Sequence, residues 1–334
     1  MEYLNIKKPT DTDYLYAAAR IRAVEAADPL GEKNEKMLNA SDFSEAINIF
    51  CDNPEDINSG NYQTLLDAEL VRSYDFVTSM IGDSPIVNIF KYPYDCNNLK
   101  LSFKGELCGR DCSELYYSFG CVNIQQLTVA MRERDFSAFP DNMALAAKEL
   151  TELVSRNPDP QLIDIILDRA CLCDMMRTAE KFGCDYLTDV IKTKTDSYNI
   201  LSFIRCVRMK KSSLFYSKLT VSGGDVDDIS LHEAYDGGLA SLADRLKITV
   251  YSELAESISR QLAQPRSGFF ADIEKELENF STRRVDEVKY IAFGPEIPVS
   301  YLINCEKNIK NAGIILAGKS AGLDTDTIRR RLRT

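Results

Sequence analysis

Apolar side chains recur three and four residues apart along most of the chain, which is the spacing of one face of an α-helix. The pattern is clear over residues 13–25, 62–81 and 141–155, and it resumes from Pro160. Ser41 is the expected N-cap of a further helix that carries Phe43, Ile47 and Phe50 on one face. The alternation that is typical of a strand is confined to residues 246–251. We therefore predict an all-α fold.

Three stretches of the sequence share a pattern in which an acidic residue precedes an Asn that is followed by Leu or Ile. They are residues 95–100, 196–201 and 306–310, and their asparagines, Asn98, Asn199 and Asn308, are 101 and 109 residues apart. A second shared pattern, at residues 120–123 and 224–227, has a spacing of 104. Two patterns in one register favour a repeat. The alternative is that acid-x-x-Asn is a common local pattern that recurs by chance.

The repeat predicts one all-α domain, residues 1–334, built from three related helical lobes. Their approximate bounds are residues 10–118, 119–220 and 221–334. Three similar lobes around one axis would enclose a central space, and that space would suit a rod-like partner.

Residues 313–320 match Gly-x4-Gly-Lys-Ser, the motif of phosphate-binding loops. That chemistry needs a loop between a strand and a helix, where backbone N–H groups surround the phosphates. Here the four middle residues are apolar and continue a helical row that runs from Leu302 to Leu316, and only fourteen residues follow. We therefore expect a helix over residues 299–317 that ends at Gly318, and no nucleotide site.

The segments around this motif carry three further expectations. Glu306 and Lys310 are four residues apart and are expected to pair on the exposed side of the helix. After a second break at Gly322, Asp324 is expected to cap a short final helix. On that helix, Ile328 and Leu332 would share one face and the arginines would take the other.

The net charge of −11 argues against broad contact with nucleic acid, which needs clustered Lys and Arg. The exception is the basic end of the chain, which contains Arg329, Arg330, Arg331 and Arg333. One interpretation is a solvated helix face whose charges suit a helix C-terminus. The other is a contact with an acidic partner or with lipid headgroups.

No window holds about 18 uninterrupted apolar residues, so no membrane-spanning helix is expected. Residues 1–5 lack the basic and then apolar start of a secretory signal. The ten cysteines are therefore expected to be reduced thiols.

Metal and catalytic signals are weak in this sequence. Two close cysteine pairs, Cys108 with Cys112 and Cys171 with Cys173, do not have Cys-x-x-Cys spacing. The single histidine, His232, is expected on the surface of a helix and not as a ligand or general base. We nominate no catalytic, cofactor-binding or metal-binding residue and expect no cofactor.

The C-terminal segment resembles the end of the C subunit of prokaryotic V/A-type rotary ATPases, which is the relative of the eukaryotic V-ATPase d subunit. The matching residues are Pro298, Tyr301, Leu302, residues 306–310, Gly318, Lys319, Gly322, Ile328, Arg329 and Leu332. Residues 14–25 resemble the first helix of the family, and residues 95–100 resemble its first lobe. Lys310 stands where the family has Arg, and residues 198–201 lack a basic residue after Ile200. Between residues 140 and 288, only periodicity and the lobe patterns support the resemblance.

This resemblance implies a funnel of three helical lobes on the cytoplasmic mouth of the membrane rotor ring. A protein of this kind receives the central-stalk D and F subunits and contacts the membrane proteolipid ring. It turns with the rotor and transmits torque for ATP-coupled H⁺ or Na⁺ transport, without binding nucleotide, ion, small-molecule substrate or nucleic acid. Its location would be peripheral, at the cytoplasmic face of the plasma membrane.

Two other functions stay open at this point. One is a helical-repeat adaptor or regulatory scaffold that is unrelated to ATPases. The other is an all-α enzyme with an acidic site. Neighbouring genes for the other ATPase subunits, or co-purification with stalk and ring subunits, would favour the rotor role over both.

Overall fold

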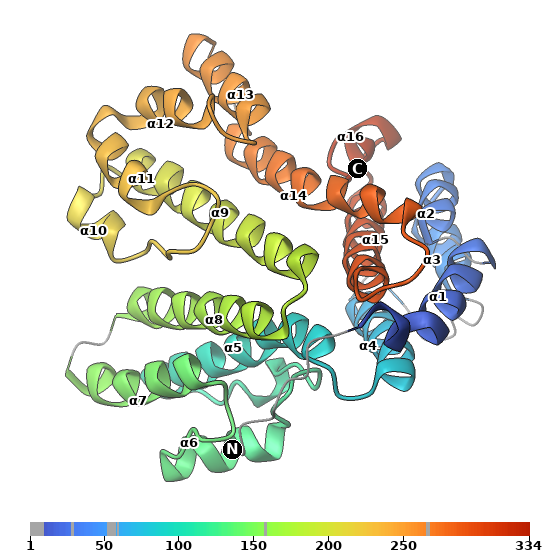
Figure 1. The fold of residues 1–334 in the computed structure, drawn as a ribbon, viewed down its shortest axis with the longest axis horizontal. Coiled ribbons are helices and arrows are strands. Elements are labelled where there is room, and N and C mark those ends of the chain that lie inside the picture. The colour runs from blue at the N-terminus through green and yellow to red at the C-terminus, as the bar shows by residue number, and fades with distance from the viewer. Residues whose placement is uncertain (1–9, 28–29, 52–57, 59, 157–158, 265–267) are drawn as a thin grey trace. The chain divides into compact units, whose positions relative to one another are not determined.

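The computed structural model describes residues 10–27, 30–51, 58, 60–156, 159–264 and 268–334. We predicted from residues 1–5 that the chain has no secretory signal, and these residues lie outside the described ranges. In the described part of the chain, every regular element is an α-helix or a 3-10 helix (Figure 1). The all-α prediction is therefore confirmed. Within the same ranges, each helix is too short or too polar to cross a membrane.

Contacts between residues divide the chain into two compact units. Unit 1 contains residues 85–273, and unit 2 contains residues 9–84 together with residues 274–334. The helix α14 (Phe269–Glu287) contributes its first residues to unit 1 and the rest to unit 2. This division does not test the predicted lobe boundaries, which stay a prediction.

Unit 1 is built around helices α5, α8 and α9. Helix α8 packs against α5, α7 and α9, and ion pairs of Lys100 with Asp168 and Lys104 with Asp164 follow the α5–α8 contact. Its helices are α5 (Pro85–Cys108), α6 (Ile124–Glu133), α7 (Asp141–Arg156), α8 (Pro160–Phe182), α9 (Asp185–Arg208), α10 (Ser213–Ser217), α11 (Asp228–Ala234), α12 (Gly238–Leu246) and α13 (Ser252–Ala263). The 3-10 helices are η2 (Ser113–Leu115) and η3 (Tyr235–Gly237).

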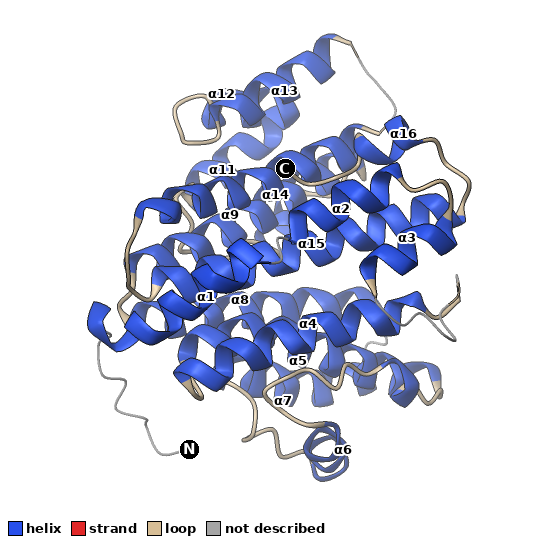
Figure 2. Cartoon of the chain, turned by 90° about the vertical axis from the view of Figure 1, so that its right-hand side faces the viewer, coloured by secondary structure: helices blue, strands red, loops and turns tan. Residues whose placement is uncertain are grey.

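Unit 2 is centred on α15 (Glu296–Ser320), and four other helices of the unit pack against it most extensively (Figure 2). Those are α1 (Leu15–Ala27), α2 (Leu30–Asn39), α3 (Phe43–Phe50) and α4 (Tyr62–Ile81). Because α15 has neighbours on several sides, it is apolar around much of its circumference, and Val299, Leu302 and Ile315 are fully buried. The remaining elements are η1 (Asp11–Tyr14), η4 (Val288–Tyr290) and α16 (Thr325–Arg329).

The predictions for Ser41 and for residues 246–251 were wrong. The N-cap before Phe43 is Asp42, whose carboxylate accepts from the N–H of Glu45 at 2.9 Å, and Ser41 instead donates to the Glu45 carboxylate. Residues 246–251 are not a strand. Leu246 ends α12, and the following residues form turns in which the Thr249 hydroxyl donates to the Leu246 carbonyl at 2.8 Å.

Candidate functional site: the ends of the three long helices

Helices α5, α9 and α15 end with the same backbone geometry. In each, an N–H beyond the helix donates at 2.9 Å to the carbonyl five residues earlier: Arg110 to Gly105, Lys211 to Cys206, and Leu323 to Gly318. The residue before each donor is left-handed, with φ of +61° at Gly109, +53° at Lys210 and +67° at Gly322. This arrangement satisfies carbonyl groups that a helix end otherwise leaves without donors.

The shared ending corrects the prediction that Gly318 ends the helix over residues 299–317. Helix α15 continues to Ser320, and the left-handed residue that follows it is Gly322. Gly318 has a packing role instead, because a Cβ there would lie 2.5 Å from Cγ1 of Ile328. It lets α16 approach the helix closely. Asp324 caps α16 as predicted, accepting from the N–H of Thr327 at 2.9 Å. Ile328 is buried on α16, whereas Leu332 lies beyond the end of that helix.

An asparagine lies seven residues before each of the three carbonyl groups, those of Gly105, Cys206 and Gly318. It binds a residue of the segment that follows the helix. Its side-chain amide donates to a backbone carbonyl, and its side-chain oxygen accepts from the N–H of the same residue. We call this two-bond contact the asparagine clamp. The pairs are Asn98 with Tyr117 at 2.8 and 2.9 Å, Asn199 with Val221 at 2.7 and 3.0 Å, and Asn311 with Arg333 at 2.9 and 2.8 Å.

The third clamp residue is therefore Asn311 and not Asn308, the position that the sequence pattern indicated. The backbone carbonyl of Asn308 accepts from the side-chain amide of Asn34 on α2 at 3.0 Å. The sequence pattern aligned Asn308 with Asn98, three residues away from the structural equivalent. Alignment on the left-handed residue beyond each helix finds Asn311, because Gly109, Lys210 and Gly322 each lie eleven residues after a clamp asparagine.

Two buried carboxylates lie three residues before the first two clamps. Asp95 accepts from the N–H groups of Cys121 at 3.0 Å and Val122 at 3.1 Å. Asp196 accepts from those of Asp225 at 3.0 Å and Val226 at 3.1 Å, and from the Tyr251 hydroxyl at 2.9 Å. At the equivalent position α15 carries the uncharged Asn308.

Burial and hydrogen bonding act in opposite directions on these two carboxyl groups. Burial raises the pKa of Asp95 and that of Asp196 to about 6, although the backbone N–H donors lower each of them. The position of each carboxylate also explains why the second sequence pattern begins with a glycine. A Cβ on Gly120 would lie 2.2 Å from Oδ1 of Asp95, and one on Gly224 would lie 1.9 Å from Oδ1 of Asp196.

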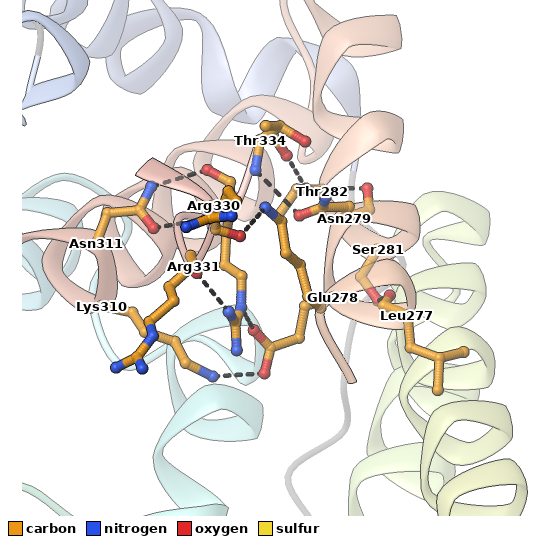
Figure 3. Close-up of polar contacts among 12 residues, drawn as sticks. Leu277, Glu278, Asn279, Ser281, Thr282, Lys310, Asn311, Arg330, Arg331 and Thr334 are labelled. Atoms are coloured by element: carbon orange, nitrogen blue, oxygen red, sulfur yellow. Dashed lines mark hydrogen bonds and ion pairs between the residues drawn. The ribbon is translucent and has the colours of Figure 1, made fainter. Parts of the chain in front are cut away.

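The C-terminal residues are held against α14 and α15 by a group of polar contacts that we call the C-terminal clasp (Figure 3). The Glu278 carboxylate accepts from Lys310 and Arg333. The Lys275 ammonium donates to the Arg330 carbonyl at 2.7 Å, and the N–H of Thr334 donates to the Asn279 side chain at 3.0 Å. Burial raises the pKa of Glu278, but hydrogen bonds and charge from Arg333 and Lys310 outweigh it, so the pKa lies below its ordinary value.

The ion pairs at the C-terminal end differ from those that the sequence predicted. The predicted pair of Glu306 and Lys310 does not form, because Glu306 accepts from the Tyr74 hydroxyl and Lys310 pairs with Glu278. Of the four predicted basic residues, Arg333 also pairs with Glu278, and Arg329 lies 3.3 Å from Glu35. Ion pairs within the chain therefore engage two of these four arginines, and the Arg330 guanidinium donates to the Thr327 hydroxyl at 3.1 Å.

The phosphate-loop look-alike, residues 313–320, lies within α15. Its helical state was predicted as far as residue 317, and the structure extends the helix to Ser320. Its backbone N–H groups belong to a continuous helix and not to a loop whose N–H groups could converge on a phosphate. Lys319 donates to the carbonyl of Ala40, at the end of α2. The residue that would contact phosphate in such a loop here connects two helices of unit 2.

The cysteine pairs and the histidine occupy separate environments. Cys108 is exposed and Cys112 is half-buried at the end of α5, whereas Cys171 is buried and Cys173 exposed on α8. His232 lies half-buried on α11, with Nε2 2.8 Å from the Thr220 hydroxyl. Among the described residues, no three His, Cys, Asp or Glu side chains form a group that would hold a metal ion.

Unit 2 also contains a cavity of about 570 Å³ lined by residues of α1, α2, α4, α14, η4 and α15. Charges of both signs pair in its wall. Arg22 lies 2.8 Å from Glu25, and Arg72 lies 3.3 Å from Glu69.

Comparison with known proteins places this architecture in a family. The model of the ATP synthase (C/AC39) subunit family matches residues 17–331. The C subunit of the V-type sodium ATPase of Enterococcus hirae is 24% identical over 273 residues, which cover 82% of each chain. The C subunit of the A-type ATP synthase of Methanococcoides burtonii is 22% identical over an alignment of 363 residues, covering 97% of this chain and 95% of the relative. The chain therefore belongs to the ATP synthase (C/AC39) subunit family.

Proposed function

We propose that this chain is a non-catalytic rotor subunit of a V/A-type rotary ATPase. In this role it links the central-stalk D and F subunits to the membrane proteolipid ring and transmits torque for ATP-coupled H⁺ or Na⁺ transport. The observation that carries the proposal is the family match over residues 17–331, together with two relatives of similar length that are both named as the C subunit of such an enzyme. Its place would be the cytoplasmic face of the plasma membrane, as a peripheral part of the complex.

The equivalent endings of α5, α9 and α15 support three related lobes. The clamp asparagines, Asn98, Asn199 and Asn311, fall one in each of the proposed lobes of residues 10–118, 119–220 and 221–334. We propose that these lobes surround a central space as a funnel that receives the stalk. A protein that transmits torque must resist deformation, and paired hydrogen bonds at the end of each long helix suit that requirement.

Reconstitution with purified partners tests this proposal. The full chain is mixed with the D and F subunits of the stalk and, separately, with the detergent-solubilised proteolipid ring. We expect it to co-elute with both. In the assembled enzyme, omission of the chain is expected to leave ATP hydrolysis by the head intact and to abolish ATP-driven ion uptake into vesicles.

Binding to neither partner would exclude the rotor role and favour the helical adaptor. Ion uptake that persists without the chain would show that it does not couple the head to the ring. A second assay addresses catalysis. The isolated chain is expected to show no ATP hydrolysis, and Lys319→Ala is expected to leave nucleotide binding unchanged at background.

A further inference from the structure

A lysine occupies a backbone position at the end of α9 where glycine stands at the ends of α5 and α15. Lys210 has φ of +53°, whereas the equivalent residues are Gly109 and Gly322. A side chain in this region has a steric cost that glycine avoids. Among the described residues, Arg134 after α6 is the other non-glycine residue with positive φ. A lysine at a position where the chain twice uses glycine is uncommon and raises the question of what its side chain contacts.

Lys210 lies within a strongly basic segment, residues 205–218, which we call the α9–α10 tip (Figure 1). The tip contains five cations, Arg205, Arg208, Lys210, Lys211 and Lys218. No Asp or Glu occurs between residues 197 and 224, in a chain with 51 acidic residues. The Arg205 guanidinium lies 4.5 Å from the ring centre of Phe270, and the Lys211 ammonium lies 4.8 Å from that of Phe215.

Acidic residues on the neighbouring α11 and η3 compensate only part of this charge. Asp228 accepts from the Ser222 hydroxyl, and Glu233 pairs with Arg245. Asp236 is the remaining acid of these two elements. The tip therefore keeps an excess of positive charge on a protein whose net charge is −11.

The tip also presents two large apolar side chains to solvent. Met209 is 60% exposed and Leu214 is 71% exposed. They flank the two lysines in sequence, and the ring of Tyr216 is buried in the same segment. Exposed apolar side chains that alternate in sequence with Lys and Arg, in a segment with no acid of its own, suit the boundary between the headgroups and the acyl chains of a bilayer.

We propose that the α9–α10 tip binds anionic phospholipid surfaces. Lys210, Lys211 and the neighbouring arginines contact the headgroup phosphates, and Met209 and Leu214 enter the interfacial layer. An acidic protein surface would be matched by the charges alone, but it would leave these two apolar side chains unexplained. The inference does not depend on the rotor role, because lipid binding is a property of the chain alone.

The test measures co-sedimentation of the full chain with vesicles that contain phosphatidylglycerol and phosphatidylcholine, and with vesicles of phosphatidylcholine alone. We expect binding to the first, weakened by added salt, and little binding to the second. Lys210→Gly is the sharpest variant, since glycine adopts the left-handed conformation without strain. It is expected to raise the melting temperature and to weaken vesicle binding about fivefold, the share of one basic residue near an anionic surface.

A second variant, Met209→Ser with Leu214→Ser, is expected to weaken binding to the same vesicles at high salt, where the charges contribute least. The matched control is Lys247→Gln with Ile248→Ser at the α12–α13 turn, where Ile248 is 87% exposed. It is expected to bind like the wild type. Equal binding to neutral vesicles, or unchanged binding by Lys210→Gly, would overturn the proposal. Binding to polyglutamate without binding to vesicles would replace it with an acidic protein partner.

Discussion

Asp95 and Asp196 each join a long helix to the segment that follows it through backbone hydrogen bonds. Both are buried, and their pKa values are raised by burial to about 6. Between the ordinary value of 3.8 and about 6, the native state therefore binds more protons than the unfolded state. The free energy of unfolding consequently falls as the pH rises through this window, by about 3 kcal/mol for each group.

Asp196→Asn removes the share of this pH dependence that belongs to Asp196. The variant is expected to be less stable than the wild type at pH 4, because one amide oxygen replaces two acceptors. That difference should shrink by about 3 kcal/mol as the pH rises through 6. Urea denaturation over a series of pH values measures this difference in the free energy of unfolding. Asp324→Asn is the control, because the pKa of Asp324 lies below its ordinary value of 3.8, so its difference from the wild type should stay flat above about pH 5. A difference for Asp196→Asn that does not vary with pH would contradict the assignment.

Gly224 is required by the close approach of the Asp196 carboxylate. Gly224→Ala is expected to destabilise the protein by about 1–3 kcal/mol, the usual cost of overpacking. Gly31→Ala is the control, because a Cβ at Gly31 meets nothing within 4 Å. Thermal unfolding compares the two. Equal melting temperatures would show that the carboxylate moves aside easily.

At the scale of elements, the three long helices differ in sequence but end alike. The apolar periodicity was sufficient to predict α4 with its observed bounds, residues 62–81. It failed at residues 246–251, where Ile248, Thr249 and Val250 have strand-like side chains. Ile248 and Val250 are exposed, and Tyr251 turns inward to donate to Asp196. The tertiary contact with Asp196 outweighs local strand preference there.

The two glycines of the phosphate-loop look-alike should respond differently to alanine, because they occupy different surroundings in α15. Gly318→Ala is expected to destabilise the protein by about 1–3 kcal/mol, since the methyl group meets Ile328 on α16. Gly313→Ala meets only the flexible end of Leu66, at 3.1 Å, and should be neutral or stabilising by up to about 1 kcal/mol. Chemical denaturation separates the two outcomes. The reverse order would contradict the helical packing of this motif.

At the scale of the whole molecule, residues 85–273 of unit 1 are continuous in sequence, whereas unit 2 combines residues 9–84 with residues 274–334. Residues 85–273 expressed alone are expected to be helical and to unfold cooperatively, because Asp95, Asp196 and their partners all lie inside this fragment. Residues 10–84 alone should lack a cooperative transition, because their helices pack on α15. Circular dichroism with urea denaturation tests both fragments. A fragment 85–273 without a cooperative transition would show that unit 1 needs unit 2 to fold.

Helical periodicity and capping determined the all-α class, the helical state of residues 313–317 and the cap at Asp324, because each depends on contacts within a few residues. The resemblance carried by the two ends of the chain indicated the family. Only the tertiary structure decided that Asn311 and not Asn308 makes the third clamp, and that Glu278 and not Glu306 pairs with Lys310. These contacts join residues 22 and 32 positions apart. Such partners depend on how helices pack, and a spacing of three or four residues carries no information about that packing.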